Sequence, residues 1–379
     1  MSSKLSRGDV RLLVAGTLMT AASAITRYVP TGRVVPFVVS ALALGFLAAI
    51  VGRSVDRLGD RLGSGMTGVV QSGLGNLPEL FFGIFALRAG LVGVVQAALI
   101  GSIIANVLLV LGLAFIVGGL RHGTQHFPAD DARTIVVLLL LAVSVLMIPT
   151  LGVHLDLAVR HHEVALSDVS AVVLLIVFLL STPGSVRREP RPSPEDLTAD
   201  DEPGTDGPTR RERHGDLGDE AGDTVGAWSI QLVVALLLAS SVAAAFVSDW
   251  FVAALSPALS ALHMSETFAG LVVVAIAGNA VENVVGVQLA ARNRSDYALS
   301  VILQSPVQIA LVLIPALVLL SGVIGGAQLT LVLSPLLGVV LALTTLIAAV
   351  VVLDGESTWL EGACLVGLYV VIAASFWWG

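Results

Sequence analysis

Long apolar stretches dominate the chain. Each runs for about 20 residues before polar or charged residues interrupt it, which is the length of a helix crossing a hydrocarbon core roughly 30 Å thick. None of them shows the alternation of apolar and polar positions that marks strands of a membrane barrel. The pattern predicts an all-α integral membrane protein with about eleven transmembrane helices. The expected spans are 11–29, 34–52, 66–87, 91–118, 134–151, 167–182, 229–248, 266–290, 298–321, 328–352 and 359–378.

Composition and charge agree with this interpretation. The chain is 56% hydrophobic and only 13% charged, which leaves too little polar surface to cover a water-soluble globule. Of the net charge of -8, most lies in residues 184–226, which contain 12 acids, 6 arginines, five prolines and seven glycines. Such a segment is typical of a disordered linker, with a loose cation-collecting or regulatory segment as the alternative. The one cysteine, Cys364, is expected to be a buried packing residue in its apolar surroundings.

The distribution of basic residues predicts the orientation. Sixteen of the 20 Lys and Arg residues fall on the side of the N-terminus, and basic loops next to spans remain in the cytoplasm. The other four are Arg27, Arg33, Arg88 and Arg160. We therefore expect a multi-pass protein of the cell membrane with the N-terminus and the 184–226 linker in the cytoplasm and the C-terminus outside. A cleaved signal peptide at residues 12–24 is the alternative to a retained first helix.

Two segments, beginning GNLPEL and GNAVEN, align without a gap at a constant offset of 203 residues. The span with the first glutamate runs outward and the span with the second runs inward, so the repeats are inverted, as in many secondary transporters. The coinciding pairs are Gly75/Gly278, Asn76/Asn279, Glu79/Glu282, Gly83/Gly286 and Ser102/Ser305. The expected organisation is an extra N-terminal helix in 1–30, a first half in 31–183 with its repeat motif at 66–119, the linker 184–226, and a second half in 227–379 with its motif at 266–321.

Glu79 and Glu282 are the acids nearest the middle of the predicted spans. Facing lipid would cost each several kcal/mol, so both are expected to point into the bundle or a watery cavity. In each half the asparagine, glutamate and glycine stand at i, i+3 and i+7 on one helix face, which places a carboxylate, an amide and a gap for another backbone in one stripe. Further hydroxyl and amide oxygens come from the following spans, at Ser102, Asn106, Ser305 and Gln308.

Two carboxylates with neutral oxygens suit a hard divalent cation, calcium above all. Protons compete for such carboxylates because the charged form loses hydration on burial. A site that holds either one divalent cation or protons, and is too costly to reorient when empty, predicts antiport. No cofactor is expected; the partners are inorganic cations, protons and the lipid bilayer, without nucleic acid.

At these repeats the chain resembles the cation/proton exchanger branch of the calcium/cation antiporter superfamily. GNLPELFFGIFALRAG with GSIIANVLLVLGLAFIVGG is similar to the first repeat of that family, and GNAVEN with SPVQIALVLIPALVLL to the second. The resemblance implies a sodium/calcium exchanger-like fold, with two inverted repeats of five helices after the extra helix, and Ca²⁺ export driven by protons. It implies that Glu79 and Glu282 are shared cation and proton sites. It further implies ligands or helpers at Asn76, Asn279, Ser102, Asn106, Ser305 and Gln308, with backbone carbonyls of Gly75 and Gly278.

Three departures from the family pattern bear on selectivity. Asn283 stands where the family's second repeat usually has His, and it cannot titrate. Gln304-Ser305-Pro306 replaces a run of small residues, adding bulk and a helix break beside the site. The proline directly before Glu79, Pro78, resembles the motif of the wider superfamily, including its sodium-coupled members.

Other functions remain as alternatives. A sodium- or potassium-linked exchanger on the same scaffold is the nearest, followed by a cation channel. An intramembrane enzyme finds no support, because the chain has no H-E-x-x-H and no G-x-S-x-G motif. His154, His161 and His162, with nearby acids, are expected to form a solvated loop rather than a metal site.

Overall fold

The computed structural model describes residues 5–62, 74–186 and 228–377. The first half contains α1 (Arg7–Tyr28), α2 (Val35–Leu62), α4 (Leu77–Arg88), α5 (Val92–Ile104), the π-helical turn η1 (Ala105–Val110), α6 (Leu111–His122), β1 (Gln125–His126), α7 (Ala129–His154), the 3-10 turn η2 (Ala158–His162) and α8 (Glu163–Val186). The second half contains α10 (Ile230–Leu262), α11 (Glu266–Phe268), the π-helical turn η3 (Ala269–Val274), α12 (Ala275–Gly278), α13 (Ala280–Ala291), α14 (Ser295–Gln308), the π-helical turn η4 (Ile309–Leu313), α15 (Ile314–Ile324), α16 (Pro335–Val352), β2 (Glu356–Ser357) and α17 (Trp359–Trp377).

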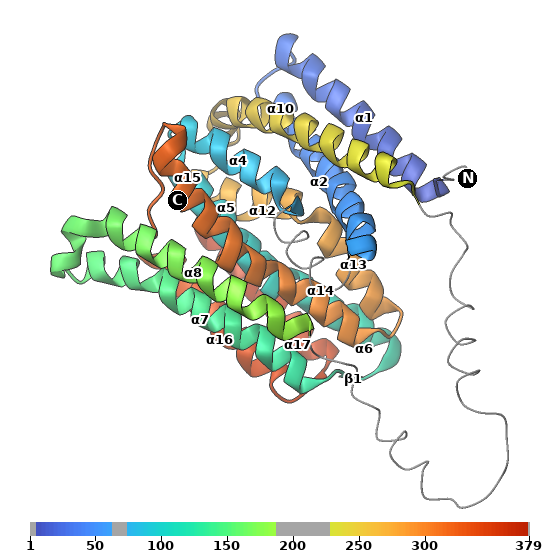
Figure 1. The fold of residues 1–379 in the computed structure, drawn as a ribbon, viewed down its shortest axis with the longest axis vertical. Coiled ribbons are helices and arrows are strands. Elements are labelled where there is room, and N and C mark those ends of the chain that lie inside the picture. Colours follow the sequence, from blue (N-terminus) through green and yellow to red (C-terminus); the bar gives the residue numbers. More distant parts are fainter. Residues whose placement is uncertain (1–4, 63–73, 187–227, 378–379) are drawn as a thin grey trace, which may run out of the picture.

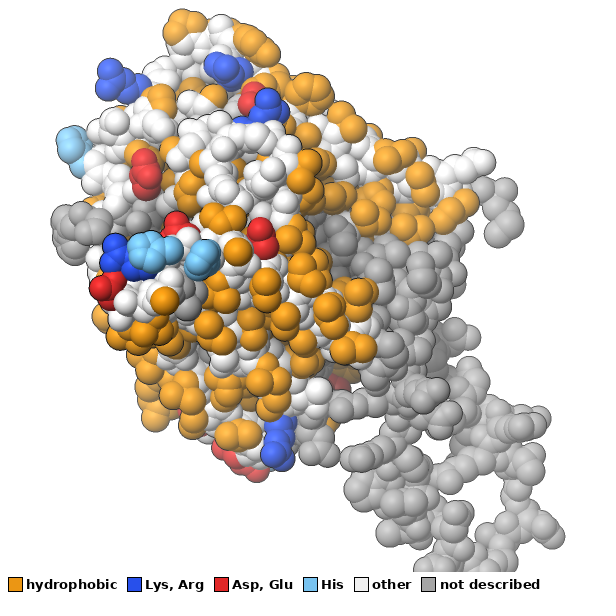
Figure 2. Space-filling model, turned by 60° about the vertical axis from the view of Figure 1, so that its left-hand side comes forward, with side chains coloured by type: hydrophobic (Ala, Val, Ile, Leu, Met, Phe, Trp, Pro, Cys, Tyr) orange, Lys and Arg blue, Asp and Glu red, His pale blue; other side chains and the backbone are white. Residues whose placement is uncertain are grey.

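The helical bundle agrees with the expected number of spans. Within the described ranges, nine helices are long and apolar enough to cross a membrane, and a tenth span results if the bent pair Glu266–Gly278 and Asn283–Ala291 is counted as one. The expected third span, 66–87, begins in residues that are not described, and α4 forms its remainder. Residues 187–227, which hold most of the expected linker, also lie outside the described part. On the face drawn in Figure 2, hydrophobic side chains cover a broad central area, and most charged and histidine side chains lie toward its margins.

The elements of the two halves correspond in order. In the first half, α2, α4, α5 to α6, α7 and α8 follow one another as α10, α11 to α13, α14 to α15, α16 and α17 do in the second. The π-helical turns η1 and η4 fall at matching positions under the offset of 203 residues. Helix α1 stands outside this pattern and packs against α2 and α10 along one edge of the bundle, opposite α7 and α8 (Figure 1). The five-helix repeats and the extra N-terminal helix are thus present.

Local signals fix α1 against its neighbours. Ser6 and Asp9 form a reciprocal capping box, in which each side chain accepts a hydrogen bond from the other residue's backbone N–H. The buried Asp9 carboxylate also pairs with Arg53 of α2. Gly16 lets Ile50 of α2 approach so closely that an added Cβ would lie 2.7 Å from its Cδ1 atom. Helix α1 is therefore packed closely on α2.

The two halves cross at backbone contact where α5 meets η3. A Cβ atom on Gly270 would lie 2.6 Å from the carbonyl oxygen of Val94, and one on Gly101 would overlap the backbone of Leu271. Neither position leaves room for any side chain, because the obstacle is backbone. Small residues allow this approach, as is common where membrane helices pack.

The expected span 328–352 is wrong at its start, because the helix begins only at Pro335. Residues 327–334 instead form an extended strap inside the bundle, with buried side chains at Leu329, Leu331 and Leu333. The strap leaves α15 through Gly326, whose φ of +111° only glycine adopts readily, and a Cβ there would lie 2.8 Å from Cα of Arg88.

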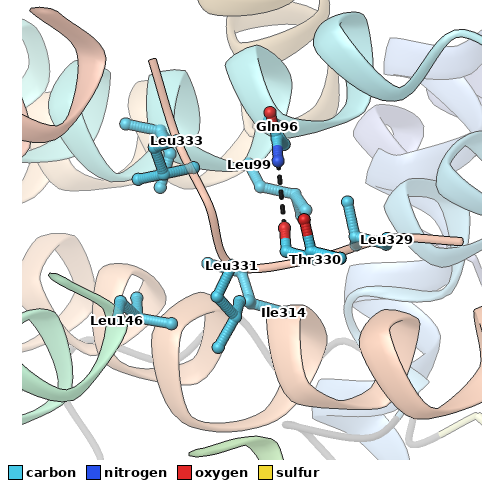
Figure 3. Close-up of a pocket in the computed structure, with 9 residues that line it drawn as sticks. Gln96, Leu99, Leu146, Ile314, Leu329, Thr330, Leu331 and Leu333 are labelled. Atoms are coloured by element: carbon cyan, nitrogen blue, oxygen red, sulfur yellow. Dashed lines mark hydrogen bonds between the residues drawn. The ribbon is translucent and has the colours of Figure 1, made fainter. Parts of the chain in front are cut away.

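Side chains from four helices satisfy the backbone of this strap. The Nε2 atom of Gln96 donates to the carbonyls of Thr330 (2.9 Å) and Val332 (3.0 Å), beside a small cavity of about 20 Å³ (Figure 3). The remaining hydrogen bonds are Thr150 Oγ1 to Leu331 O (2.9 Å), Leu331 N to Ser167 Oγ (2.9 Å), Leu333 N to Thr150 Oγ1 (3.0 Å) and Leu329 N to Ser321 Oγ (3.0 Å). Non-helical backbone at this depth is tolerated because protein polar groups replace water.

Two further expectations are corrected. Cys364 is exposed, not buried, because the packed face of α17 carries Gly362, Leu365 and Tyr369 instead. Lipid and protein core are equally apolar, so an apolar sequence does not tell them apart. Helix α10 runs beyond the expected end at residue 248, and the acid Asp249 therefore lies within it.

Candidate functional site between the repeats

An asparagine interrupts the helix in the same way in both repeats. Asn76 has φ -93° and ψ 17° at the start of α4, and Asn279 has φ -96° and ψ 17° at the start of α13. Their carbonyl oxygens accept the backbone N–H of Leu80 (2.9 Å) and of Asn283 (3.0 Å). In the second repeat the axis bends by 61° between the flanking helices. Interrupted helices of this kind expose backbone groups to ligands at the centre of transporters.

Glu79 of the first repeat lies against Gly278, the counterpart of Gly75 in the second repeat. Its Oε1 atom is 2.8 Å from the position that a Cβ on Gly278 would take, and its Cγ and Cδ atoms are 3.2 and 3.3 Å from it. The glycine therefore makes room for the carboxylate. Glu282 occupies the corresponding place in the first turn of α13, and its side chain lies outside the described part of the structure. Gly75 forms the turn directly before Asn76.

The amide and hydroxyl residues expected at the site are all buried, and several join the two repeats. The Nδ2 atom of Asn76 donates to Oε1 of Gln308 (3.4 Å). The hydroxyl of Ser305 donates to Oδ1 of Asn279 (3.2 Å) and lies 3.5 Å from Nδ2 of Asn106. The structure thus brings the first-repeat residues Asn76 and Asn106 next to Gln308 and Ser305 of the second. Ser102 is buried on the same helix as Asn106, one turn earlier.

Asn106 presents an amide oxygen to this region. Its Nδ2 atom donates to the backbone carbonyl of Ser102 (3.0 Å), which orients the amide group. Its Oδ1 atom is buried and has no hydrogen-bond partner among the described residues. The same holds for Oδ1 of Asn283, one turn after Asn279. A buried oxygen without a donor is costly unless a ligand or water satisfies it. Asn283 is therefore a candidate oxygen donor, although the sequence indicated only a missing histidine there.

The π-helical turns begin beside these residues. Asn106 is in η1, and Gln308 immediately precedes η4. Such turns occur frequently at functional sites. Pro306 does not break its helix, since α14 continues through it to Gln308. Because η1 forms at the matching position without a proline, Pro306 is not required for the π turn.

The surroundings of Gln304 and of the two glycines Gly83 and Gly286 differ from what the sequence predicted. Gln304 is exposed, so it adds no bulk among the buried site residues. The gaps at Gly83 and Gly286 are occupied by side chains rather than by backbone. An added Cβ would lie 2.7 Å from Leu317 Cδ1 at Gly83 and 2.8 Å from Ile302 Cδ1 at Gly286.

Two groups of polar residues lie outside this centre. His154 ends α7, and His161 and His162 lie in η2. No group of three His, Cys, Asp or Glu side chains able to hold a metal occurs among the described residues. Asp249, which the sequence placed beyond its span, lines a cavity of about 490 Å³ together with Arg88 at the end of α4. The sequence did not place Asp249 inside a helix, because the hydropathy pattern put the end of the span at residue 248, whereas α10 continues to Leu262.

Comparison with known proteins agrees with the geometry. The family described as sodium/calcium exchanger protein matches residues 33–185 and 232–378, which together make up most of the chain. The chain belongs to this family. Among curated exchangers it is 32% identical over 341 residues to a Ca(2+)/H(+) antiporter of Aphanothece halophytica, covering 90% of this chain and 89% of that one. It is 30% identical over 385 residues to the Ca(2+)/H(+) antiporter ChaA of Bacillus subtilis, covering 98% and 97%.

Solved exchanger structures share the fold. The native structure of YfkE superposes with a TM-score of 0.76 at 26% identity and covers 97% of this chain and 99% of its own. The H+/Ca2+ exchanger CAX gives a TM-score of 0.70 over 97% of this chain and 91% of its own; at 16% identity it supports the fold alone. The all-α exchanger fold expected from the repeats is therefore confirmed.

Proposed function

We propose that this exchanger is a secondary active antiporter that exports Ca²⁺ from the cytoplasm in exchange for protons, by alternating access to one site between the repeats. The observation that carries the proposal is the position of the Glu79 carboxylate against Gly278, the residue before Asn279, while buried amide and hydroxyl residues join the two repeats by hydrogen bonds. The names of the relatives at 30% and 32% identity support calcium and protons as the exchanged ions.

The proposed site uses hard oxygen donors only. Glu79 and Glu282 bind either the cation or protons, and neutral oxygens complete the shell. The proposed contributors are Asn76, Asn279, Ser102, Asn106, Ser305, Gln308 and the backbone carbonyls of Gly75 and Gly278. One divalent cation or two protons neutralise the same pair of carboxylates, so the site returns only when loaded. This coupling follows from the cost of burying two unpaired charges.

The proposed direction of transport depends on how the protein is oriented in the membrane. With the N-terminus in the cytoplasm, protons enter and Ca²⁺ leaves. Helices α2 and α10 flank the proposed site, because α2 packs on α10, α12 and α13, and α10 packs on α4. These contacts place both helices beside the interrupted helices of the two repeats. A relative movement of this pair would change which side reaches the site.

The test is uptake of labelled Ca²⁺ into proteoliposomes with an imposed pH gradient and no sodium. We expect uptake that requires the gradient and loss of uptake in Glu79→Gln and in Glu282→Gln. The control Glu356→Gln, which removes an exposed carboxylate in β2, should show wild-type uptake. Transport retained by both site variants would refute the assignment of the site. Ca²⁺ flux that follows a sodium gradient after the pH gradient is collapsed would identify a sodium-linked exchanger instead.

A further inference from the structure

A second polar cavity lies away from the proposed ion site. It has a volume of about 380 Å³ and lies between the C-terminal end of α1, the loop that leads to α2, and the C-terminal half of α10. Its lining includes Ser23, Arg27, Thr31, Arg33 and Trp250. None of these residues has a part in the antiport proposed above.

The charge in this cavity is entirely positive. Arg27 and Arg33 both line it, no acidic residue does, and neither arginine forms an ion pair with a described residue. The sequence contains only four basic residues on this side of the predicted bundle, and two of them meet here. Guanidinium groups bind phosphate with charge-assisted hydrogen bonds and suitable geometry. The cavity is therefore suited to an anion.

Two hydroxyl groups in the cavity lack partners among the described residues. The side chain of Ser23 is only 1% exposed, and its Oγ atom has no hydrogen bond. The Oγ1 atom of Thr31 is likewise buried without a partner. Both hydroxyls can donate to an anionic oxygen, which would satisfy polar groups that the protein itself leaves unsatisfied.

The surroundings indicate a lipid rather than a soluble anion. Tyr28 and Trp250 meet edge to face at 6.5 Å beside the cavity, and such aromatic residues mark the depth of the headgroups in a membrane. On the adjoining surfaces of α1 and α10, Leu18 is 62% exposed, Ile25 59% and Phe246 59%. These apolar side chains offer acyl chains a path away from the arginines.

We propose that this cavity binds the phosphate headgroup of an anionic phospholipid, with Arg27 and Arg33 holding the phosphate and the Ser23 and Thr31 hydroxyls donating to its oxygens. Phosphatidylglycerol fits better than phosphatidylcholine, because no carboxylate is present to balance a choline ammonium group. The lipid would join α1 to α10 at the end opposite to the Asp9–Arg53 ion pair.

The test measures binding of dioleoyl-phosphatidylglycerol to the full-length protein in neutral detergent, by native mass spectrometry and by the shift in thermal unfolding. Dioleoyl-phosphatidylcholine and soluble glycerol 3-phosphate serve as comparison probes. The site variant is Arg27→Gln/Arg33→Gln. The matched control is Arg121→Gln/Arg292→Gln, which removes the same charge from exposed arginines outside this cavity. Ser23→Ala tests a buried hydroxyl without changing charge.

We expect the wild type to bind phosphatidylglycerol about 10-fold or more tightly than phosphatidylcholine, because the choline ammonium of phosphatidylcholine would lie near two guanidinium groups with no carboxylate to balance it. The site variant should lose this preference, Ser23→Ala should weaken the binding of phosphatidylglycerol, and the control should bind both lipids as the wild type does. Equal binding of both lipids by the wild type, or an undiminished preference in the site variant, would overturn the proposal. Wild-type binding of phosphatidylglycerol by Ser23→Ala would overturn the part given to that hydroxyl. A full thermal shift with glycerol 3-phosphate alone would overturn the lipid as the ligand and leave a soluble phosphate ester.

Discussion

The contact between Glu79 and Gly278 leads to a quantitative prediction. In Gly278→Ala the new Cβ would lie 2.8 Å from Oε1 of Glu79, whereas ordinary contacts begin at 3.4 Å. The carboxylate must therefore retreat by about 0.6 Å. Its Cγ and Cδ atoms at 3.2 and 3.3 Å must move with it, so rotation of the carboxylate alone does not relieve the contact.

This displacement is large for a calcium ligand. Ca²⁺–oxygen distances span only about 2.3–2.6 Å, so a shift of about 0.6 Å removes the oxygen from the shell unless the whole site follows. Every 1.4 kcal/mol corresponds to a tenfold change in affinity, and loss of one charge-assisted ligand is worth at least that. We expect the half-saturating Ca²⁺ concentration for transport to rise about tenfold or more.

The fold should survive this change. Gly278 ends helix α12 without a left-handed φ, and the group that must move is the end of a flexible side chain. The assay is Ca²⁺ concentration dependence of proton-driven uptake in proteoliposomes, beside thermal unfolding. Gly52→Ala in α2 is the matched control, because nothing lies within 4 Å of its added Cβ. Wild-type affinity in Gly278→Ala, or an equal loss in Gly52→Ala, would refute the reasoning.

Two further predictions concern stability. Replacing Gln96 by Leu removes two hydrogen bonds to carbonyls of the strap and should lower the free energy of unfolding by about 2–4 kcal/mol, measured by thermal or denaturant unfolding in detergent; an unchanged midpoint, equal to that of the exposed-site control Gln304→Leu, would contradict this. Gly270→Ala sets a Cβ 2.6 Å from a backbone oxygen, so it should lower the free energy of unfolding by about 1–3 kcal/mol and reduce the monodisperse fraction in size-exclusion chromatography. The control Gly93→Ala, with open space around it, should behave as wild type. Equal behaviour of the two variants would show that the crossing of α5 and η3 can relax.

Much of the architecture follows from local sequence. A run of about 20 apolar residues has few ways to satisfy its backbone in lipid other than a helix, so the number and order of the spans could be predicted. The paired GN motifs with their glutamates could be aligned because polar residues are rare in such spans. Their inverted orientation follows from the number of predicted spans that separate them. The burial of Asn76, Asn106, Asn279 and Ser305 was predicted for the same reason.

Tertiary structure decided what depends on partners distant in the sequence. Residues 327–334 are apolar enough for a helix, yet they are extended because Gln96, Thr150, Ser167 and Ser321 replace the helical hydrogen bonds. Cys364 faces outward because hydropathy does not distinguish lipid from core. The approach of Glu79 to Gly278 joins positions about 200 residues apart. Periodicity records which side chains avoid water, and only the packing of the two repeats determines which of them meet.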